Sequence, residues 1–260
     1  AMEEVLKKEL GKNGRFAGVA LTTGSAGTIG CGDYLKQVFP TSKITGSEAL
    51  QCPTLLLDGY GAHRIEGIGD KHVPWIHNVK NTDMITAIDD NAVVNIMRLF
   101  NEPAGKELLV KQGVPQDIVE KLDLMGFSGI ANVLSAIKMA KWYELTSKDV
   151  VMTVLTDSME LYNTRIQEYR DEYGDFTAFD AASAYSRDLH GQSTDNTLEL
   201  TYPDRRRVHN LKYYTWVEQQ GRSYDEIMDQ WYDDDYWTGL QAQIPEIDKL
   251  ITEFNNQVGL

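Results

Sequence analysis

Up to about residue 155, short apolar runs alternate with segments whose apolar residues recur at helical spacing. The runs predict strands over residues 16–21, 43–46, 84–88 and 150–155, and the periodic segments predict helices over residues 3–10, 29–38, 89–99 and 130–142. The last run is apolar almost throughout, which is typical of a parallel strand buried on both faces. Strands that alternate with helices in this way predict a doubly wound α/β fold, with a mostly parallel sheet and flanking helices.

Residues 51–58 and 59–70 show little periodicity and form a long predicted loop. Its second part carries glycines at positions 59, 61, 67 and 69. Glycines at such density suggest a backbone that approaches a ligand closely, because long irregular loops in compact domains are often functional. An ordinary glycine-rich surface loop is the alternative interpretation.

Beyond Gly174 the composition becomes aromatic and acidic. Three helices are predicted there, over residues 205–219, after the capping-box sequence that begins at Ser223, and after Pro245. The last of them places its apolar residues on one face, namely Ile247, Leu250, Ile251 and Phe254. We therefore expect two domains, an α/β domain over residues 2–174 and a helical extension over residues 175–260 packed against it.

The run from Trp231 to Trp237 places three aspartates between aromatic residues. Such a run could serve as a partner site or a lid. We favour the more common arrangement, in which the aromatics attach the extension to the core while the acids face water. The three arginines at positions 205–207 are likewise expected to form a solvated face or to pair with acidic neighbours.

Composition narrows the functional classes. The 260 residues carry a formal net charge of −14, which disfavours nucleic acid and anionic membranes as partners. No apolar run is long enough to span a bilayer, and no leader-like segment is present. Cys31 and Cys52 do not form a disulfide framework, which suits a reducing cytosol, so a cytoplasmic location is expected.

Two kinds of catalytic centre find no support in the sequence. The five histidines share no metal-ligand spacing, so no metal site is predicted. A Gly-x-Ser-x-Gly nucleophile elbow, as found in many hydrolases, is also absent.

The strongest local signal is the small-residue turn that joins the first predicted strand to the second predicted helix. It consists of Gly24, Ser25, Ala26, Gly27 and Thr28. A turn in this position offers free backbone N–H groups at the positive end of a helix dipole, which suits a phosphate. No Gly-Lys-Ser/Thr follows, and Leu35 stands where the dinucleotide fingerprint requires a third glycine. A Gly-x-x-Gly-Thr phosphate cradle remains, with a tight glycine turn for packing as the alternative.

Four motifs in order resemble the cysteine synthase and cystathionine β-synthase family of fold-type II pyridoxal-phosphate enzymes. The turn at residues 24–28 is similar to the family's Gly-Thr-Gly-Gly-Thr phosphate loop, and residues 61–69 are similar to its Gly-Ile-Gly loop. Residues 126–140 resemble its Gly-Ile-Ser-Ser-Gly-Ala-Asn helix entry, and residues 150–162 the strand end that contacts the pyridine nitrogen. The resemblance covers residues 2 to about 169 and implies the large domain of a tryptophan synthase β-like fold.

The resemblance also implies roles for particular residues. The phosphate of pyridoxal phosphate would bind residues 24–28, and Gly67 would lie close to the substrate. Ser158 would be the hydrogen-bond partner of the pyridine nitrogen, with Asp157 as its rival. A neutral hydroxyl there leaves the nitrogen largely unprotonated, which suits α,β-elimination and β-replacement on a small amino acid.

The Schiff-base lysine of the family is missing from its expected context. The family carries it in its N-terminal half, in a Ser-x-Lys setting, and Lys148 in Thr146-Ser147-Lys148-Asp149 is better explained as part of a plain turn. We expect the chain to be the cofactor-cradling C-terminal domain alone, either an engineered piece or one subunit of a split enzyme. It would have no catalytic residue and no turnover by itself, and it would need the N-terminal half or a partner subunit. Homo-oligomerisation is also expected.

The sequence departs from the family in two places. An extra charged segment lies between Phe100 and Gly126, and Ser128-Gly129-Ile130 replaces the family's Ser-Ser-Gly. Both departures concern the substrate class more than the cofactor. Two alternatives therefore stay open: a non-catalytic assembly module with a vestigial cofactor site, and a part of a pyridoxal-phosphate thiolase-type enzyme.

Overall fold

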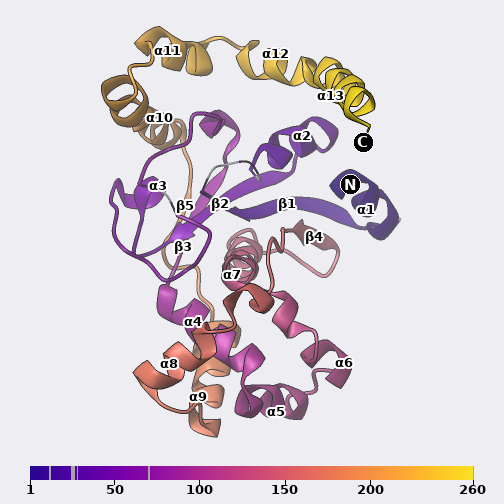
Figure 1. Cartoon of the computed structure of the whole chain (residues 1–260), viewed down its shortest axis with the longest axis vertical. Coiled ribbons are helices and arrows are strands. Elements are labelled where there is room, and N and C mark those ends of the chain that lie inside the picture. The colour runs from indigo at the N-terminus through magenta and orange to yellow at the C-terminus, as the bar shows by residue number, and fades with distance from the viewer. Residues whose placement is uncertain (12, 25–26, 28, 70, 260) are drawn as a thin grey trace.

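A computed structural model describes residues 1–11, 13–24, 27, 29–69 and 71–259, so Ser25, Ala26 and Thr28 lie outside the described residues. The centre of the molecule is a sheet with the strand order β4-β1-β2-β3-β5 (Figure 1). The strands are β1 (Arg15–Thr22), β2 (Lys43–Ala49), β3 (Met84–Ile88), β4 (Asp149–Met152) and β5 (Thr197–Glu199). The first four are parallel, and β5 runs antiparallel to β3.

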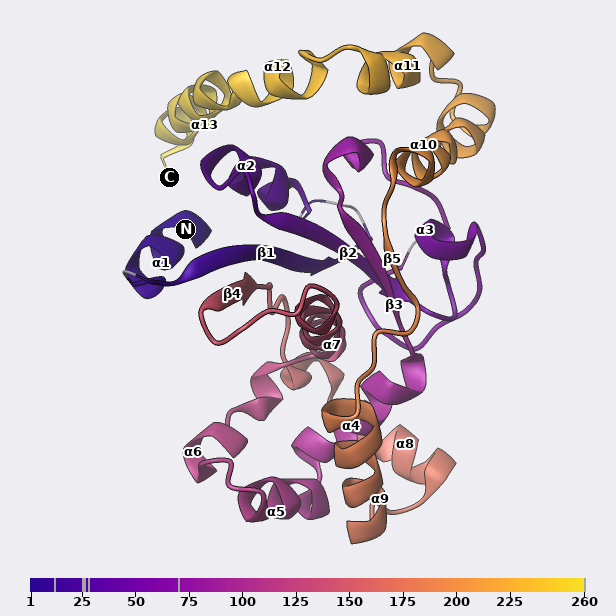
Figure 2. The same ribbon diagram turned by 180° about the vertical axis from the view of Figure 1, so that it is seen from behind.

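Helices cover both faces of the sheet, which confirms the predicted α/β class. On one face lie α1 (Met2–Glu9) and α2 (Gly30–Val38), and on the other lies α7 (Phe127–Trp142), as Figures 1 and 2 show. Other helices connect or cover these layers: α3 (Thr54–Leu57), α4 (Asp90–Asn101), α5 (Pro103–Lys111), α6 (Gln116–Val119), α8 (Arg165–Tyr173) and α9 (Ala178–Ser183). The C-terminal helices are α10 (Tyr202–Asn210), α11 (Tyr224–Tyr232), α12 (Tyr236–Ala242) and α13 (Ile244–Val258).

The order of the strands creates a switch point beside β1. The chain moves from β1 through β2 to β3 in one direction, then crosses over to place β4 on the other side of β1. In open α/β sheets, ligands bind outside the carboxyl ends of the strands at such a point. The loop that follows Thr22 opens there.

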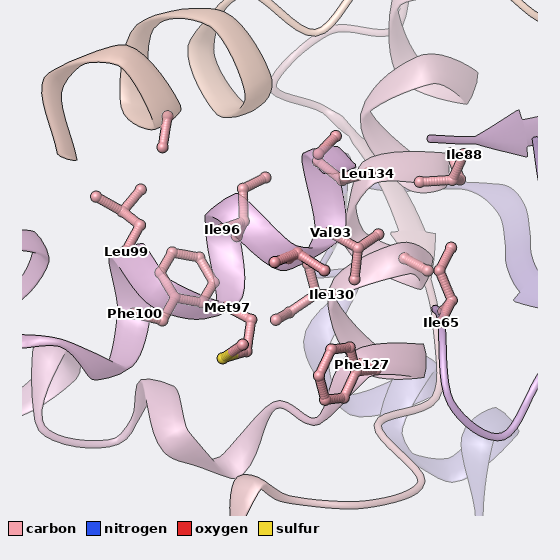
Figure 3. Packing of buried hydrophobic residues seen from close by; sticks show 14 of the residues in the cluster. Ile65, Ile88, Val93, Ile96, Met97, Leu99, Phe100, Phe127, Ile130 and Leu134 are labelled. Carbon is pink, nitrogen blue, oxygen red and sulfur yellow. The ribbon is translucent and has the colours of Figure 1, made fainter. Parts of the chain in front are cut away.

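The largest apolar core lies between α4 and α7, below the sheet (Figure 3). Val93, Ile96 and Met97 of α4 face Phe127 and Ile130 of α7, and all five are almost completely buried. The α4 helix begins as predicted, because the Asp89 side chain accepts a hydrogen bond from the Asn91 N–H. This core fixes the N-terminal end of α7 beside the edge of the sheet.

The prediction of a fully buried strand over residues 150–155 is wrong. The strand β4 covers only Asp149–Met152, each residue is half-buried, and Leu155 is exposed. Within the described sheet, β4 pairs with β1 alone and forms its edge. An apolar run indicates burial but does not show how many neighbours a strand has.

The segment after residue 174 begins within the α/β layer and ends outside it. Its first part adds β5 to the sheet and packs α9 and a π-helical turn (Ala184–His190) against α4. Its second part runs from α10 to α13 as an arc over one side of the molecule (Figures 1 and 2). The predicted capping box at Ser223 is confirmed, and Trp231 is buried while the three aspartates that follow are exposed.

The expectation that the last helix packs against the α/β layer is wrong. The apolar face of α13 is exposed, with Leu250 55% and Phe254 60% accessible to solvent. Amphipathic spacing predicts that a helix has an apolar face but does not identify what covers it.

Candidate functional site

Two predicted ligand loops meet at the carboxyl edge of the sheet. The Gly69 N–H donates to the Thr23 carbonyl at 2.9 Å, and the Thr23 N–H donates to the Ser47 carbonyl at 2.7 Å. A Cβ atom added to Gly24 would lie 3.8 Å from the Gly67 carbonyl oxygen. The structure therefore places the start of the phosphate turn directly beside the glycine loop.

The glycine loop has a conformation that demands glycine. Gly67 and Gly69 have φ angles of +78° and +84°, which side chains rarely tolerate. A Cβ atom on Gly69 would also lie 2.3 Å from Nε2 of His63. The imidazole ring of His63 thus supports the loop from within, where only a glycine leaves room for it.

Asn132, in the second turn of α7, joins two strand ends. Its side-chain oxygen accepts from the Thr22 N–H at 2.6 Å, and its side-chain nitrogen donates to the Val154 carbonyl at 2.7 Å. Asn132 is only 1% exposed, so both bonds are shielded from water. This bridge holds the segment after β4 beside the end of β1.

The carboxylate of Asp157 is occupied by hydroxyl groups. It accepts from Ser128 Oγ at 3.1 Å and from the hydroxyl of Tyr162, while the Asp157 carbonyl accepts from the Gly126 N–H at 3.0 Å. Burial and the neighbouring Asp157 raise the pKa of Tyr162 above its usual range, so Tyr162 remains a donor. Asp157 therefore ties the end of this segment to the N-terminus of α7.

The neighbouring Ser158 differs from Asp157 in its hydrogen bonding. It precedes a short 3₁₀-helix (Met159–Tyr162), and its hydroxyl makes no hydrogen bond to any residue that the structure describes. It is half-buried and lines a hollow of about 420 Å³ together with Asn101 and Asp123. No hydrogen bond links Ser158 to the described residues of the phosphate turn, Gly24 and Gly27.

Lys148 lies at the wrong end of the sheet for a cofactor lysine. Its carbonyl accepts from the Arg15 N–H, so it sits beside the first residue of β1. At about 3.3 Å per residue, the far end of that strand at Thr22 is roughly 23 Å away. The Asp149 carboxylate accepts from the Thr146 N–H and closes a turn, which agrees with the plain-turn interpretation.

The C-terminal arc holds the segment that follows the glycine loop. The fully buried Lys212 donates from Nζ to the Trp75 and His77 carbonyls, at 2.9 and 2.8 Å, and to the side chain of Gln230 at 2.6 Å. Trp216 donates from its indole to the Val73 carbonyl at 2.8 Å. These bonds fix the backbone of residues 73–77 to the π-helical turn at Tyr213–Gln219 and to α11.

No described carboxylate pairs with Lys212, which faces two buried histidines instead. Burial lowers the pKa of Lys212 to about 7. Burial, with the charge of Lys212, lowers the pKa of His77 to about 3 and that of His209 to about 4. Both histidines are therefore neutral at physiological pH.

A buried acid supports the first half of the same long loop. The Glu48 carboxylate accepts from the Leu55 and Leu56 N–H groups, each at 2.8 Å, where the short helix α3 begins. Burial raises the pKa of Glu48 to about 7, although these bonds oppose the shift. Arg207, on α10, donates to the Leu55 carbonyl from the far side.

Sequence reasoning missed these supporting residues. Asn132 lies within the helix entry that resembles the family motif, so its position was a signal that could have been used. Lys212 and Glu48 carry no such signal, because a lone charged residue in a helix or strand is normally exposed. Tertiary packing buries them: the C-terminal arc and residues 73–77 enclose Lys212, and α3 lies against Glu48 on the inner strand β2.

The described part of the chain meets the requirements neither of a membrane-spanning helix nor of a metal site. None of its helices has the length and apolar character needed to cross a bilayer. Among the same residues, no cluster of three or more histidine, cysteine or acidic side chains is arranged to hold a metal ion.

Comparison with known proteins gives a consistent result, although no family model matches the chain. Over 140 residues it is 31% identical to cysteine synthase B of Campylobacter jejuni and 28% identical to cysteine synthase of Staphylococcus aureus. Each match covers 54% of this chain, but only 40% and 39% of those proteins. The chain thus spans about two-fifths of the length of the curated relatives it matches.

Solved structures agree on the fold. A hydrogen sulfide-producing enzyme from Fusobacterium nucleatum matches with a TM-score of 0.51 and 23% identity, over 76% of this chain and 52% of the enzyme. O-acetylserine sulfhydrylase isoform 3 from Entamoeba histolytica gives the same TM-score and identity, over 70% and 48%. The chain therefore resembles part of a cysteine synthase-like enzyme in sequence and in fold.

Proposed function

We propose that this chain, similar to cysteine synthases over about half its length, is the cofactor-cradling part of a pyridoxal-phosphate-dependent enzyme. The whole enzyme would be a lyase or β-replacement enzyme that acts on a small amino acid. One observation supports the proposal: Gly24 at the start of the turn lies beside Gly67 of the glycine loop, and Asn132 ties Val154, after β4, to the end of β1 at the switch point of the sheet. This is where an α/β sheet binds a phosphate-bearing ligand.

The residue types of the turn suit the phosphate of the cofactor, because glycines at positions 24 and 27 let backbone N–H groups approach an anion closely. Ser158 has a hydroxyl with no hydrogen bond to a described residue, whereas the Asp157 carboxylate already accepts from three hydroxyl groups, those of Ser128, Thr156 and Tyr162. This difference favours Ser158 over Asp157 as the partner of the pyridine nitrogen.

Pyridoxal phosphate, when bound, supplies an electron sink for the amino-acid substrate. The residues of this chain would bind the cofactor and orient it toward the substrate. Residues 24–28 would hold the phosphate through backbone groups and the hydroxyls of Ser25 and Thr28, and Gly67 would lie close to the substrate. Ser158 Oγ would be the hydrogen-bond partner of the pyridine nitrogen, and a neutral partner there suits elimination and replacement at the β-carbon. Asn132 holds the end of β1 and the segment after β4 together through its two hydrogen bonds.

The Schiff-base lysine would come from outside these elements. Lys148 lies roughly 23 Å from the phosphate turn, beyond the reach of a lysine side chain. We infer that the chain does not turn over alone and that the N-terminal half of the enzyme, or a partner subunit, supplies the lysine and the substrate-carboxylate loop.

A binding titration tests the proposal. Quenching of tryptophan fluorescence by pyridoxal phosphate is expected for the wild-type chain and is expected to disappear in Gly27→Val, because a branched side chain fills the turn. The matched control is Gly239→Val in α12, where an added Cβ meets no atom within 4 Å. Equal binding by Gly27→Val and the control contradicts the assignment of the phosphate turn.

A second function is favoured by the exposed apolar face of α13. The chain would then be a non-catalytic assembly module whose cofactor site is vestigial. This hypothesis predicts no affinity for pyridoxal phosphate even when the N-terminal half is supplied. Binding in either setting rejects it.

A further inference from the structure

The helix α13 carries a heptad pattern of apolar residues. Ile244, Ile247, Ile251, Phe254 and Val258 follow one another at alternating steps of three and four residues. The pattern extends back into α12, where Leu240 lies four residues before Ile244, and the single residue between the two helices also has helical backbone angles. Spacing of this kind places these five residues on one narrow stripe, as in the seam of a coiled coil, and Leu250 lies at its border.

This stripe is exposed. The apolar side chains of α13 are between 47% and 60% accessible, and within the described residues none of them is counted among the buried core. A helix of 15 residues that buries no face is at best marginal in water. The stability of α13 therefore requires a partner that covers the stripe.

We propose that the partner is α13 of a second copy of this chain. The first position of each heptad holds Ile244, Ile251 or Val258, and the fourth holds Ile247 or Phe254, so both positions of the seam are apolar throughout. A helix with this stripe is complementary to itself, because a stripe of this width fits between the side chains of a like stripe.

The charges of α13 agree with self-pairing. Glu246, Lys249 and Glu253 lie away from the stripe, and of the positions that flank it within the helix only Asp248 is charged. Two copies therefore do not bring like charges together along the seam, even though each chain carries a formal charge of −14. A partner with a strongly charged surface would find no complementary row of charges here.

The available area is sufficient for a specific contact. Six apolar side chains that are about half exposed offer roughly 90 Å² each, so two copies would bury about 1,100 Å² in total. This value lies near the lower end for specific interfaces, so we expect a reversible dimer with a dissociation constant in the micromolar range.

Sedimentation velocity of the full-length chain over about 1 to 100 µM tests the proposal. The wild-type chain is expected to shift from monomer to dimer over this range. Ile251→Asp places a charge in the seam and is expected to weaken the dimer at least tenfold. Thr252→Asp adds the same charge one position further on, outside the stripe, and is expected to leave the dimer unchanged.

Either of two results overturns the proposal. One is a wild-type chain that stays monomeric at 100 µM, which leaves the stripe to some other occupant. The other is a dimer that Ile251→Asp and Thr252→Asp affect equally, which places the interface elsewhere. Far-UV circular dichroism and the main thermal transition verify that both variants keep the α/β core.

Discussion

Replacement of Lys212 by methionine gives the sharpest test of how the C-terminal arc supports the glycine loop. The variant removes the ammonium group and leaves the Trp75 carbonyl, the His77 carbonyl and Gln230 without their donor. Each buried acceptor that loses its partner costs about 1–3 kcal/mol. The same variant gains stability because it no longer buries the positive charge of the lysine.

The pKa of Lys212 sets the size of that second contribution. Burial lowers it from 10.5 to about 7, so at pH 7 the folded wild-type protein bears a cost of roughly 4 kcal/mol for the charge. Three orphaned acceptors cost about 3–9 kcal/mol in total, so the relief of burial offsets the loss of hydrogen bonds only in part. We expect Lys212→Met to lower the free energy of unfolding by up to about 5 kcal/mol at pH 7.

The free energies of unfolding of the wild type and of Lys212→Met diverge as the pH rises. Between pH 7 and 10.5 the unfolded wild-type chain keeps the Lys212 proton while the folded chain has lost it, so wild-type stability increases with pH. From pH 7 to pH 9 this gain amounts to about 2–3 kcal/mol, and Lys212→Met lacks it. The neutral His77 and His209 do not titrate in this range, because burial holds their pKa values at about 3 and 4.

Urea unfolding followed by circular dichroism at pH 7 and pH 9 measures the divergence. The control is Lys111→Met, which removes an exposed lysine paired with Glu107 and should keep the wild-type pH dependence. Parallel pH dependence of Lys212→Met and the wild type would refute the reasoning, since it would mean that Lys212 keeps its ordinary pKa in the folded protein.

Two other substitutions test the loops of the candidate site by chemical denaturation. Gly69→Ala should lower the free energy of unfolding by about 2–4 kcal/mol, because the added Cβ collides with His63 and the positive φ is strained for alanine. The control Gly11→Ala also has a positive φ but open space around it, so it should lower the free energy of unfolding by only about 1 kcal/mol. Equal losses would show that His63 does not support the loop. Asn132→Ala should cost about 2–4 kcal/mol, since it orphans two shielded backbone groups, and a loss below about 1 kcal/mol would show that water replaces the bridge.

The sequence predicted best those helices and strands that depend on local patterns of residues. The strand at residues 84–88 coincides with β3, and the helix after Asp89 begins where its cap predicts. Both depend on neighbours within a few positions along the chain. The contact between Gly24 and Gly67 was not predicted, although both loops follow parallel strands at one edge of the sheet.

The features that sequence missed depend on distant contacts. The edge position of β4 follows from which strands pair, and β5 at Thr197–Glu199 was hidden within a segment expected to be helical. The burial of Lys212 follows from the packing of the C-terminal arc on a loop about 135 residues earlier in the chain. Nothing in the spacing of residues near Lys212 records that contact.

We propose that this chain holds pyridoxal phosphate without supplying the lysine that fixes it. Incubation with pyridoxal phosphate, borohydride reduction and peptide mapping test this proposal. We expect saturable binding with no single lysine trapped, and trapping on a lysine of the N-terminal half once that half is added. One specifically reduced lysine in the chain alone, at Lys148 or elsewhere, would disprove the proposal, and so would a lack of binding both with and without the other half.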